Sequence, residues 1–476
     1  MITIKSNKLY ASAKAVITQY LFLPGDNRIK NIIDRVENLS EEQAILNLEK
    51  VKEEFEGRHR YFEEILVNHF SRVSLQYQKD LTHLSLTRKL LLGALFTKEY
   101  SIQAAALFNP SITPHPDQGN LKPGEQRFVM SMRATGEGHI SSIIFQTGII
   151  EANGNILLDE QSGYFTCLKK NDVTVYTKNF VQERIAFFPE FNTALLDSLP
   201  ETFTASEAIH TVKIKEETSL KKTLHSSSLN QLAEILDSNY ELENSYHLPI
   251  NEKVIFPVAN VECMGMEDVR FVKFEDGDLN YYGTYTAYNG KEIRTQMIET
   301  KDFHSFKVRT LYGEAVKDKG MALFPEKING KYTMISRQDG EKMYIMYSDN
   351  LWKWDAYQLL MEPHFNWEIV QVGNCGSPLK TEKGWLLLTH GVGSMRTYVI
   401  SAILLDLKDP TKVIGRLNRP LIKADELERE GYVPNVVYTC GFIRHQNLLI
   451  IPYAVSDSAT AFATIELNEI LNEIKL

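Results

Sequence analysis

The repeating unit of this chain is clearest in three consecutive runs: GTYTA at Gly283–Ala287, IRTQMI at Ile293–Ile298 and the polar loop KDFHSF at 301–306. The two apolar runs have the length and the β-branched and aromatic content of strands, and a short polar turn links them. Four further pairs follow the same plan: Gln126–Met132 with Ile140–Phe145, Lys331–Ser336 with Met343–Tyr347, Gly384–Thr389 with Tyr398–Leu405, and Asn447–Tyr453 with Ala461–Ile465. Units spaced by roughly fifty to sixty residues fall in the range of propeller blades. We therefore expect a mainly β protein, with a five-bladed β-propeller over residues 101–476.

The first hundred residues have a different pattern, which predicts an α-helical N-terminal extension over residues 1–100. Ser40 to Gln43 reads as a capping box, and apolar residues recur at helical spacing from Ile45 to Phe70. We expect this extension to be structural, and its helices are a candidate surface for homo-oligomer formation. A helical run at Leu229–Leu236 interrupts the strand pattern and predicts a partly helical insertion around 190–250.

Composition excludes several classes of function. The chain has 476 residues and a formal net charge of -9, so we expect no nucleic-acid partner. Its four cysteines are far apart and form no CxxC, which argues against a structural zinc site; we expect no metal and no other cofactor. The N-terminus lacks a sustained apolar region, and no span is apolar enough to cross a membrane. We therefore expect a cytoplasmic protein with no membrane partner.

Two charged segments stand out against this background. GMEDVR, at Gly265–Arg270, places adjacent carboxylates and a cation at the head of an apolar run, and KDKGMALFPEKINGKY, at Lys317–Tyr332, surrounds a second apolar run with charges. Unpaired buried charges are costly, so such clusters need a solvated pocket or partners. A propeller gathers one loop from every blade at one mouth, so we expect both segments to contribute to one polar site that suits a sugar.

Asp268 is the leading candidate acid, although a structural Asp–Arg pair that closes a turn explains the residues about equally well. Four basic residues each lie beside the end of an expected strand: Lys317, Lys319, Arg337 and His390. Together they could bind an anion or sugar hydroxyls. Singly, each is more often a solvated charge or a satisfied structural group.

The region from about Phe108 to Ile465 resembles glycoside hydrolase family 130, which contains β-mannoside phosphorylases and β-1,2-mannosidases. The matching segments keep their order and spacing: FNPSI at 108–112, GMEDVRF at 265–271, YYGTYTAY at 281–288, LFPEKINGKY at 323–332, GWLLLTHGV at 384–392, EREGYVPNVVYTCG at 428–441 and YAVSDSAT at 453–460. The resemblance implies a five-bladed propeller and an inverting enzyme that acts on a small oligosaccharide.

The resemblance also implies roles for individual residues. The family's acid corresponds to Asp268, which would act through a sugar hydroxyl. We assign substrate binding to the six residues Glu267, Arg270, Arg133, Tyr285, Glu326 and Asp457. We assign three residues to the side of the substrate from which phosphate or water attacks: Lys319, Arg337 and His390. A hydrolase also needs a carboxylate base, for which Glu314, Glu341 and Glu368 are the candidates.

This sequence departs from the family's pattern at three places. EDPR has become EDVR, and the Arg-Pro dipeptide after the GKY strand has become Arg337-Gln338, which keeps the cation. A lysine common before the family's glycine pair is replaced by Gln371. Loss of one cation weakens anion binding, so our first expectation is exo-acting hydrolysis of terminal mannose from short, β-1,2-linked mannosides. Phosphorolysis that releases mannose 1-phosphate, with inorganic phosphate as co-substrate, is the alternative. A non-catalytic carbohydrate-binding propeller is a second alternative.

Overall fold

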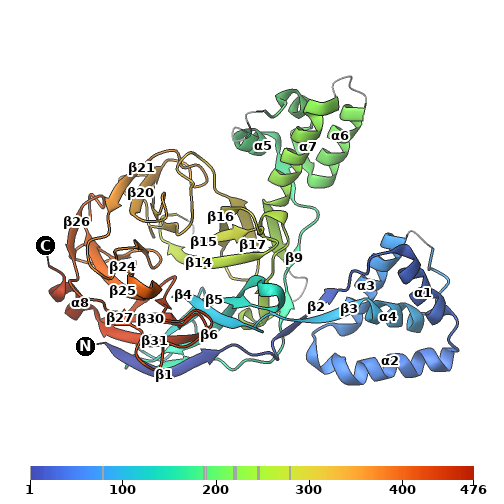
Figure 1. Cartoon of the computed structure of the whole chain (residues 1–476), viewed down its shortest axis with the longest axis horizontal. Helices are drawn as coiled ribbons and strands as arrows, with labels where there is room; N and C mark the ends of the chain where they lie inside the picture. Colours follow the sequence, from blue (N-terminus) through green and yellow to red (C-terminus); the bar gives the residue numbers. More distant parts are fainter. Residues whose placement is uncertain are drawn as a thin grey trace.

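The structure is a computed structural model that describes residues 2–77, 80–185, 188, 190–217, 222–243, 247–277 and 280–475. The protein is mainly β, as predicted from the sequence. Figure 1 shows the strands gathered in one body, from which two groups of helices project. Within the described ranges, no helix combines the length and the hydropathy needed to cross a membrane.

The largest sheet carries the residues from GMEDVR and FNPSI. Its strands run in the order β4 (Ala106–Pro114), β5 (Gln126–Thr135), β6 (Ser141–Ile150), β14 (Gly265–Phe274), β15 (Asn280–Tyr288), β16 (Ile293–Thr300), β17 (Phe306–Thr310), β12 (Tyr240–Glu243) and β9 (Lys169–Lys170). The short strands β7 (Ile156–Leu158), β8 (Thr166–Cys167) and β13 (Lys253–Ile255) attach beside β6. A single parallel bridge between Gly265 and Ser141 joins the β4–β6 part to the β14–β17 part.

Three smaller sheets follow along the chain. The first contains β18 (Ala322–Leu323), β19 (Tyr332–Ser336), β20 (Met343–Ser348) and β21 (Tyr357–Met361). The second contains β22 (Gln371–Asn374), β23 (Leu379–Lys380), β24 (Trp385–Val392), β25 (Tyr398–Leu405), β26 (Val413–Arg416) and β27 (Ile422–Lys423). The third contains β28 (Val437–Tyr438), β29 (Ile443–His445), β30 (Leu448–Val455), β31 (Ala459–Glu466) and β1 (Thr3–Tyr10).

Each of the five strand pairs predicted from the sequence is an antiparallel pair in these sheets. Apolar clusters join successive groups of strands face to face. One cluster packs β14–β16 against β18–β20, the next packs β19 and β20 against β24 and β25, and a third packs β24 and β25 against β30 and β31. Two more clusters connect β30 and β31 to β5, and β6 to β14 and β15.

The first hundred residues are not helical throughout, because the chain begins with strand β1, which pairs with the last strand, β31. The helices are α1 (Asp26–Glu37), α2 (Glu41–Phe55), α3 (Phe62–Tyr77) and α4 (Leu86–Leu95), and we call residues 26–95 the helical arm. A two-stranded ribbon of β2 (Val16–Tyr20) and β3 (Thr97–Ser101) leads into and out of this arm. The Ser40 capping box predicted from the sequence begins α2.

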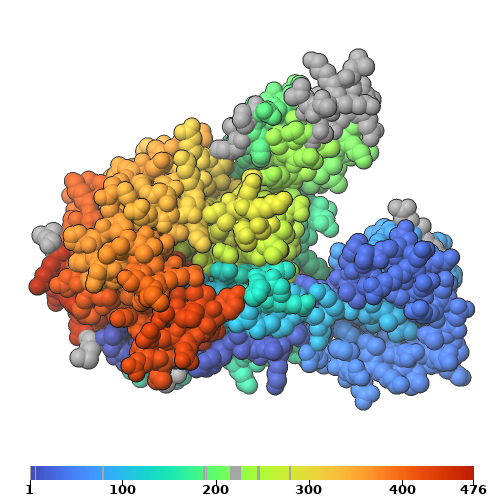
Figure 2. Space-filling view, viewed as in Figure 1, coloured from blue at the N-terminus to red at the C-terminus, as the bar shows by residue number. Residues whose placement is uncertain are grey.

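The predicted insertion begins earlier in the chain than expected. It contains β10 (Val175–Thr177), α5 (Lys178–Ile185), β11 (Thr202–Thr204), α6 (Ala205–Glu217) and α7 (Lys222–Asp237), which share a small apolar core. We call residues 175–237 the helical insertion. Figure 2 shows the insertion and the helical arm as two lobes that stand away from the sheets. The remaining helical elements are the 3-10 turns Glu56–Arg58, Glu137–His139, Thr193–Ser198, Ile250–Glu252, Asn260–Glu262 and Ser394–Arg396, and the C-terminal helix α8 (Leu467–Glu473).

Candidate active site

A cavity of about 260 Å³ collects polar side chains from all four sheets that carry the predicted strand pairs. We call it the central pocket. Its lining residues are Asn109, Arg133, Asp268, Arg270, Lys319, Gly320, Arg337, Gln371, Gly373, Asn374, His390, Arg396, Tyr398, Val436, Tyr438 and Asp457. Residues separated by more than three hundred positions in the chain therefore meet at one site.

Two β-bulges present the residues at the centre of this pocket. The β4–β5 register shifts between Phe108 and Ser111, and the β14–β15 register shifts between Glu267 and Arg270. Asn109, with φ of 49°, and Asp268, with φ of 56°, lie within these bulges in the left-handed region that non-glycine residues seldom adopt. Bulges re-aim side chains and are common beside active sites. Here the two bulges bring Asn109 and Asp268 into contact.

Asp268 is held in an ionised state by its neighbours. Its Oδ1 accepts a hydrogen bond of 2.6 Å from Asn109 Nδ2 and a second, of 3.3 Å, from Arg133 Nη1. Burial opposes ionisation, but the charges of Arg133, Lys319 and Arg270, together with the Asn109 hydrogen bond, outweigh it and keep the pKa of Asp268 below its usual value. The Asp268 carboxyl is therefore a carboxylate at neutral pH.

The cations of the pocket are fixed by separate contacts. Arg270 donates from Nη1 to the backbone oxygen of Asp268 at 3.0 Å and from Nη2 to the hydroxyl of Tyr438. Arg337 donates from Nε to Asp318 Oδ2 at 3.1 Å. Lys319 follows Asp318 directly and lines the pocket from the loop before β18. The side chains of Arg270 and Arg337 are thus held in place before any ligand enters, which reduces the entropy lost on binding.

His390 lies in the pocket but cannot supply the cationic contact we expected of it. Its Nδ1 is 3.1 Å from the backbone oxygen of Asn374, and because that oxygen only accepts, Nδ1 carries the proton. Burial and the charges of Arg337 and Arg270 lower the pKa of His390 to about 3. The ring is therefore neutral and its Nε2 is an acceptor, which lies 3.4 Å from Gln371 Nε2. Gly373 allows this placement, because a Cβ there would lie 2.4 Å from the imidazole.

Asp457, in the turn between β30 and β31, is the second carboxyl group that lines the pocket. Burial, followed by the negative charge of Asp268, raises the pKa of Asp457 to about 7, although Arg133 and Arg396 oppose the shift. Asp268 and Asp457 thus have pKa values that are pushed apart. Separation of this kind between two carboxyl groups is typical of sites in which they have different roles.

Three of the predicted site residues do not line the central pocket. Glu267 accepts a hydrogen bond of 2.8 Å from Arg133 Nη2, so it stands beside the pocket and orients a pocket residue. Tyr285 is buried within β15 and donates to Glu262 Oε2 at 2.6 Å instead of lining the pocket. Glu326 forms an ion pair with Lys380 at 2.5 Å. The other predicted residues, Asp268, Arg270, Arg133, Asp457, Lys319, Arg337 and His390, all line the pocket.

The three glutamates considered as a hydrolytic base also lie outside the pocket. Glu314 and Glu341 are exposed on loops. Glu368 is buried, but both of its oxygens accept hydrogen bonds from Arg416 Nη2, and it also accepts from the backbone of His364 and Phe365. The carboxyl groups among the described lining residues are those of Asp268 and Asp457 alone.

Sequence reasoning missed several lining residues. Asn109 belongs to the FNPSI segment, where the Asn-Pro dipeptide was a usable signal for an irregular strand. Tyr438 lies in the matched segment EREGYVPNVVYTCG, and Tyr398 stacks on His390 with ring centroids 5.8 Å apart. Arg396, an exposed residue with φ of 55°, adds a further cation at the rim. The pocket therefore has five cationic side chains and two carboxyl groups, although the whole chain has a net charge of -9.

Comparison with known proteins gives consistent matches. The model of a family described as beta-1,4-mannooligosaccharide phosphorylase matches residues 226–476. A 1,2-beta-oligomannan phosphorylase from a Thermoanaerobacter species is 35% identical over 227 residues, which cover 46% of this chain and 75% of that protein. A beta-1,2-mannobiose phosphorylase from Listeria innocua is 30% identical over 243 residues, which cover 49% of this chain and 67% of that protein. The solved structure of the Listeria innocua enzyme with beta-1,2-mannobiose aligns with a TM-score of 0.48 at 22% identity, covering 78% of this chain and 92% of that one.

Proposed function

Because the chain belongs to glycoside hydrolase family 130 and is thus a glycoside hydrolase or glycoside phosphorylase, we propose that it phosphorolyses β-mannosides. The substrate is a short β-1,2-linked mannooligosaccharide, and the products are mannose 1-phosphate and a saccharide shortened by one unit. The relatives at 30% identity or more that carry a β-1,2 name support this linkage. Hydrolysis, our first expectation from the sequence, becomes the alternative.

The excess of cations in the central pocket is the observation that carries this proposal. The pocket contains two carboxyl groups, and that of Asp457 has a pKa of about 7. Against these stand five cationic side chains: Arg133, Arg270, Lys319, Arg337 and Arg396. A phosphate dianion would compensate this charge, and charge-assisted hydrogen bonds from arginine and lysine are well suited to it. Water would not compensate it. The cation lost at Gln371 is therefore outnumbered by those that remain.

Asp268 and phosphate act on opposite faces of the mannosyl unit in this proposal. A phosphate oxygen, held by Lys319 and Arg337, forms a bond to the anomeric carbon while the bond to the glycosidic oxygen breaks. The leaving oxygen receives a proton from Asp268 by way of a sugar hydroxyl, and the proton carried by the bound phosphate later restores Asp268. Binding of the anion offsets the surrounding cations, so it raises the pKa of Asp268 and makes the carboxyl a competent acid.

Two groups are suited to hold the mannosyl unit itself. Asn109 Oδ1 is buried and accepts no hydrogen bond from any described residue, although Nδ2 of the same side chain is bound to Asp268. A buried acceptor without a partner is costly, and a sugar hydroxyl would satisfy it. Asp457, protonated or ionised, is a second hydrogen-bonding group that lines the pocket.

The fold that supports this site is, we propose, a closed five-bladed propeller. Five groups of strands pack in a cycle: β4–β6, β14–β17, β18–β21, β22–β27, and β28–β31 with β1. The apolar clusters described above join each group to the next, including the last to the first. Pairing of β1 with β31 adds the first strand of the chain to the last group.

Product analysis tests the proposed reaction. We expect β-1,2-mannobiose to yield mannose and mannose 1-phosphate only when inorganic phosphate is present. Release of two mannose molecules per disaccharide without phosphate would make the enzyme a hydrolase. Turnover of neither kind, together with retained sugar binding, would support the non-catalytic alternative.

Lysine variants test the phosphate side of the pocket. Lys319→Ala should raise the KM for phosphate by roughly tenfold to a hundredfold, the effect of one charge-assisted contact. Lys317→Ala is the matched control, because Lys317 stands two residues away and faces the ring of Tyr357 at 5.7 Å instead. Equal effects of the two substitutions would argue against phosphate binding at Lys319.

A further inference from the structure

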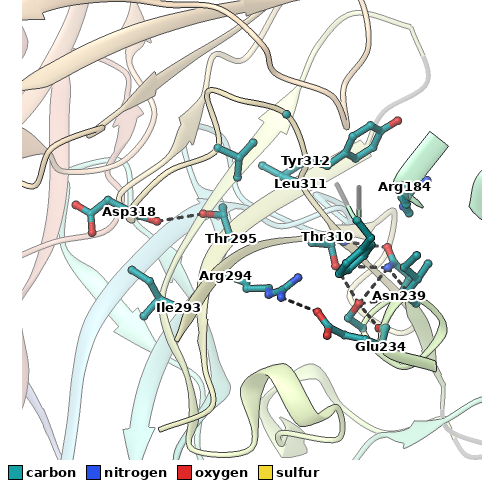
Figure 3. A pocket seen from close by; sticks show the side chains of 15 residues that line it. Arg184, Glu234, Asn239, Ile293, Arg294, Thr295, Thr310, Leu311, Tyr312 and Asp318 are labelled. Atoms are coloured by element: carbon teal, nitrogen blue, oxygen red, sulfur yellow. Dashed lines mark hydrogen bonds and ion pairs between the residues drawn. The ribbon is translucent and has the colours of Figure 1, made fainter. Parts of the chain in front are cut away.

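A second cavity, of about 270 Å³, lies between the helical insertion and the sheet. We call it the outer cavity. Its walls come from α5 and α7 of the insertion, from β16 and β17, and from the loop that leads from β17 towards β18. Figure 3 shows Asp318 and Arg184 on opposite sides of this cavity, with Thr295, Arg294 and Tyr312 between them.

The outer cavity lies near the same end of the sheet as the central pocket. Gly265, at the start of β14, pairs with Tyr288 at the end of β15, and Tyr288 in turn pairs with Ile293 at the start of β16. Asp268 and Thr295 therefore lie close to the same edge. They are two strands apart, which corresponds to about 10 Å across a sheet.

A single loop forms the wall between the two cavities. Tyr312, Val316 and Asp318 line the outer cavity, whereas Lys319 and Gly320, the next residues, line the central pocket. Asp318 is bound from both sides, because its backbone oxygen accepts from Thr295 Oγ1 at 3.5 Å and its Oδ2 accepts from Arg337 Nε at 3.1 Å. A molecule that extends outward from Asp268 across β15 would reach the outer cavity along this wall.

Arg184 lines the outer cavity, and one of its nitrogen donors has no hydrogen-bond partner among the described residues. The residue is only 5% exposed, and its guanidinium lies against the rings of Phe180 and Tyr312, at 3.6 and 4.9 Å from their centroids. Nη1 donates to the backbone oxygen of Phe180, but no described residue accepts from Nε. Burying such a donor without a partner is unfavourable, and a ligand oxygen would satisfy it.

The remaining lining suits a neutral saccharide more than an anion. Arg294 is already paired with Glu234 of α7 at 2.6 Å, and Asp318 is paired with Arg337, so most of the charges are balanced. Ile293 and Leu311 add apolar surface next to the aromatic ring of Tyr312. Apolar surface with a few fixed polar groups is the usual composition of a pocket for a small organic ligand, and it matches the apolar faces and hydroxyl groups of a sugar.

We propose that the outer cavity holds the distal units of a β-mannooligosaccharide whose terminal mannose occupies the central pocket. The inference rests on the proposed phosphorylase function and adds to it a preference for substrates of more than two units. The helical insertion, which supplies Arg184 and Glu234, is then a substrate-binding element.

The test compares β-1,2-mannobiose with β-1,2-mannotetraose in the presence of phosphate. Ile293 is 40% exposed at the start of β16, a position in a strand where tryptophan is tolerated. In Ile293→Trp, the larger side chain fills part of the outer cavity, so kcat/KM for the tetrasaccharide should fall at least tenfold further than that for the disaccharide. Leu157→Trp, on β7 and 47% exposed, is the matched control and should lower neither value by more than twofold.

If Ile293→Trp leaves the ratio of the two kcat/KM values unchanged, either because neither value falls or because both fall equally, the proposal is overturned. Hydrogen exchange in the wild type without phosphate gives a readout that needs no turnover. Mannotetraose, but not mannobiose, should slow amide exchange at residues 310–313, and equal protection by both sugars would contradict the inference. If the enzyme were not a phosphorylase, mannobiose with phosphate would give no mannose 1-phosphate, whereas the exchange experiment would still decide whether the outer cavity binds saccharide.

Discussion

Asn109 and Asp268 are 159 positions apart in the chain, yet the amide of one donates a 2.6 Å hydrogen bond to the carboxylate of the other. Each residue lies in a bulge with a positive φ, and the strands that carry them belong to two different strand groups of the largest sheet. Unfavourable backbone conformations of this kind persist only where surrounding structure enforces them. Here the two bulges support each other through their side chains.

Substitution of Asn109 by alanine should remove this support. Loss of a hydrogen bond to a charged group is worth about 1.5–3 kcal/mol, so we expect kcat/KM for mannobiose and phosphate to fall by roughly tenfold to a hundredfold. Asn155→Ala is a matched control, because Asn155 donates to the carboxylate of Glu151 far from the pocket. If both variants behave like the wild type, Asn109 does not orient Asp268.

Asp268→Asn should abolish turnover but retain saccharide binding. The amide keeps the shape of the side chain but cannot deliver a proton, and loss of general acid catalysis costs typically 10²–10⁴-fold in rate. Asp349→Asn is the control, since Asp349 is a loop aspartate that pairs with Lys331 at 3.4 Å and does not line the pocket. Steady-state rates and calorimetric titration with mannobiose separate the two effects. A variant that turns over at the rate of the wild type would exclude Asp268 as the acid.

Asp457 should make the stability of the protein depend on pH. Its pKa is raised in the folded state to about 7 from the ordinary value of 3.8. Between these values the folded protein retains a proton that the unfolded chain releases, so the contribution of Asp457 to stability falls as the pH rises from about 4 to 7. Asp457→Asn cannot ionise and should lose this dependence.

Thermal unfolding in phosphate-free buffer measures this effect. The difference in Tm between Asp457→Asn and the wild type should shift in favour of the variant as the pH is raised from 4.5 to 8. A difference in Tm that is constant over this pH range would show that the pKa of the Asp457 carboxyl is not raised in the folded state.

His390 should remain neutral across the physiological pH range. Burial, Arg337 and Arg270 lower its pKa to about 3, so protonation is expected only well below pH 5. In a histidine-labelled sample, its ring resonances should not move between pH 5 and 8, whereas exposed histidines titrate near pH 6.5. The resonance is assigned through its loss in His390→Gln. Titration of this signal near neutrality would restore His390 as a cationic phosphate ligand.

The strand pairs could be predicted because each is local: two apolar runs separated by a polar turn. The charged segment around Asp268 could also be predicted, since a charge cluster at the head of a strand needs a pocket or partners. Contacts between strand groups could not be predicted from the sequence. Asn109 reaches Asp268, and Tyr438 reaches Arg270, through packing that no local pattern records.

The placement of residues outside the pocket has a similar physical cause. Tyr285 lies in a matched motif, but strand residues alternate between the two faces, and its side chain points to Glu262 instead of the pocket. Glu326 lies on a charged loop that also carries pocket residues, yet Lys380 holds it elsewhere. His390 was placed correctly, but its charge state depends on a backbone carbonyl and on two arginines from other segments.

Tyr20 at the end of β2 pairs with Thr97 at the start of β3. The chain therefore enters and leaves the helical arm through two adjacent, paired strands. Deleting residues 21–96 and joining the ribbon with a tight turn would convert it into an ordinary hairpin while keeping β1 against β31. The protein could thus be made about 76 residues shorter without breaking a strand contact around the central pocket. The deletion would remove the contact of Arg60 with the buried Glu252, which lies outside that pocket.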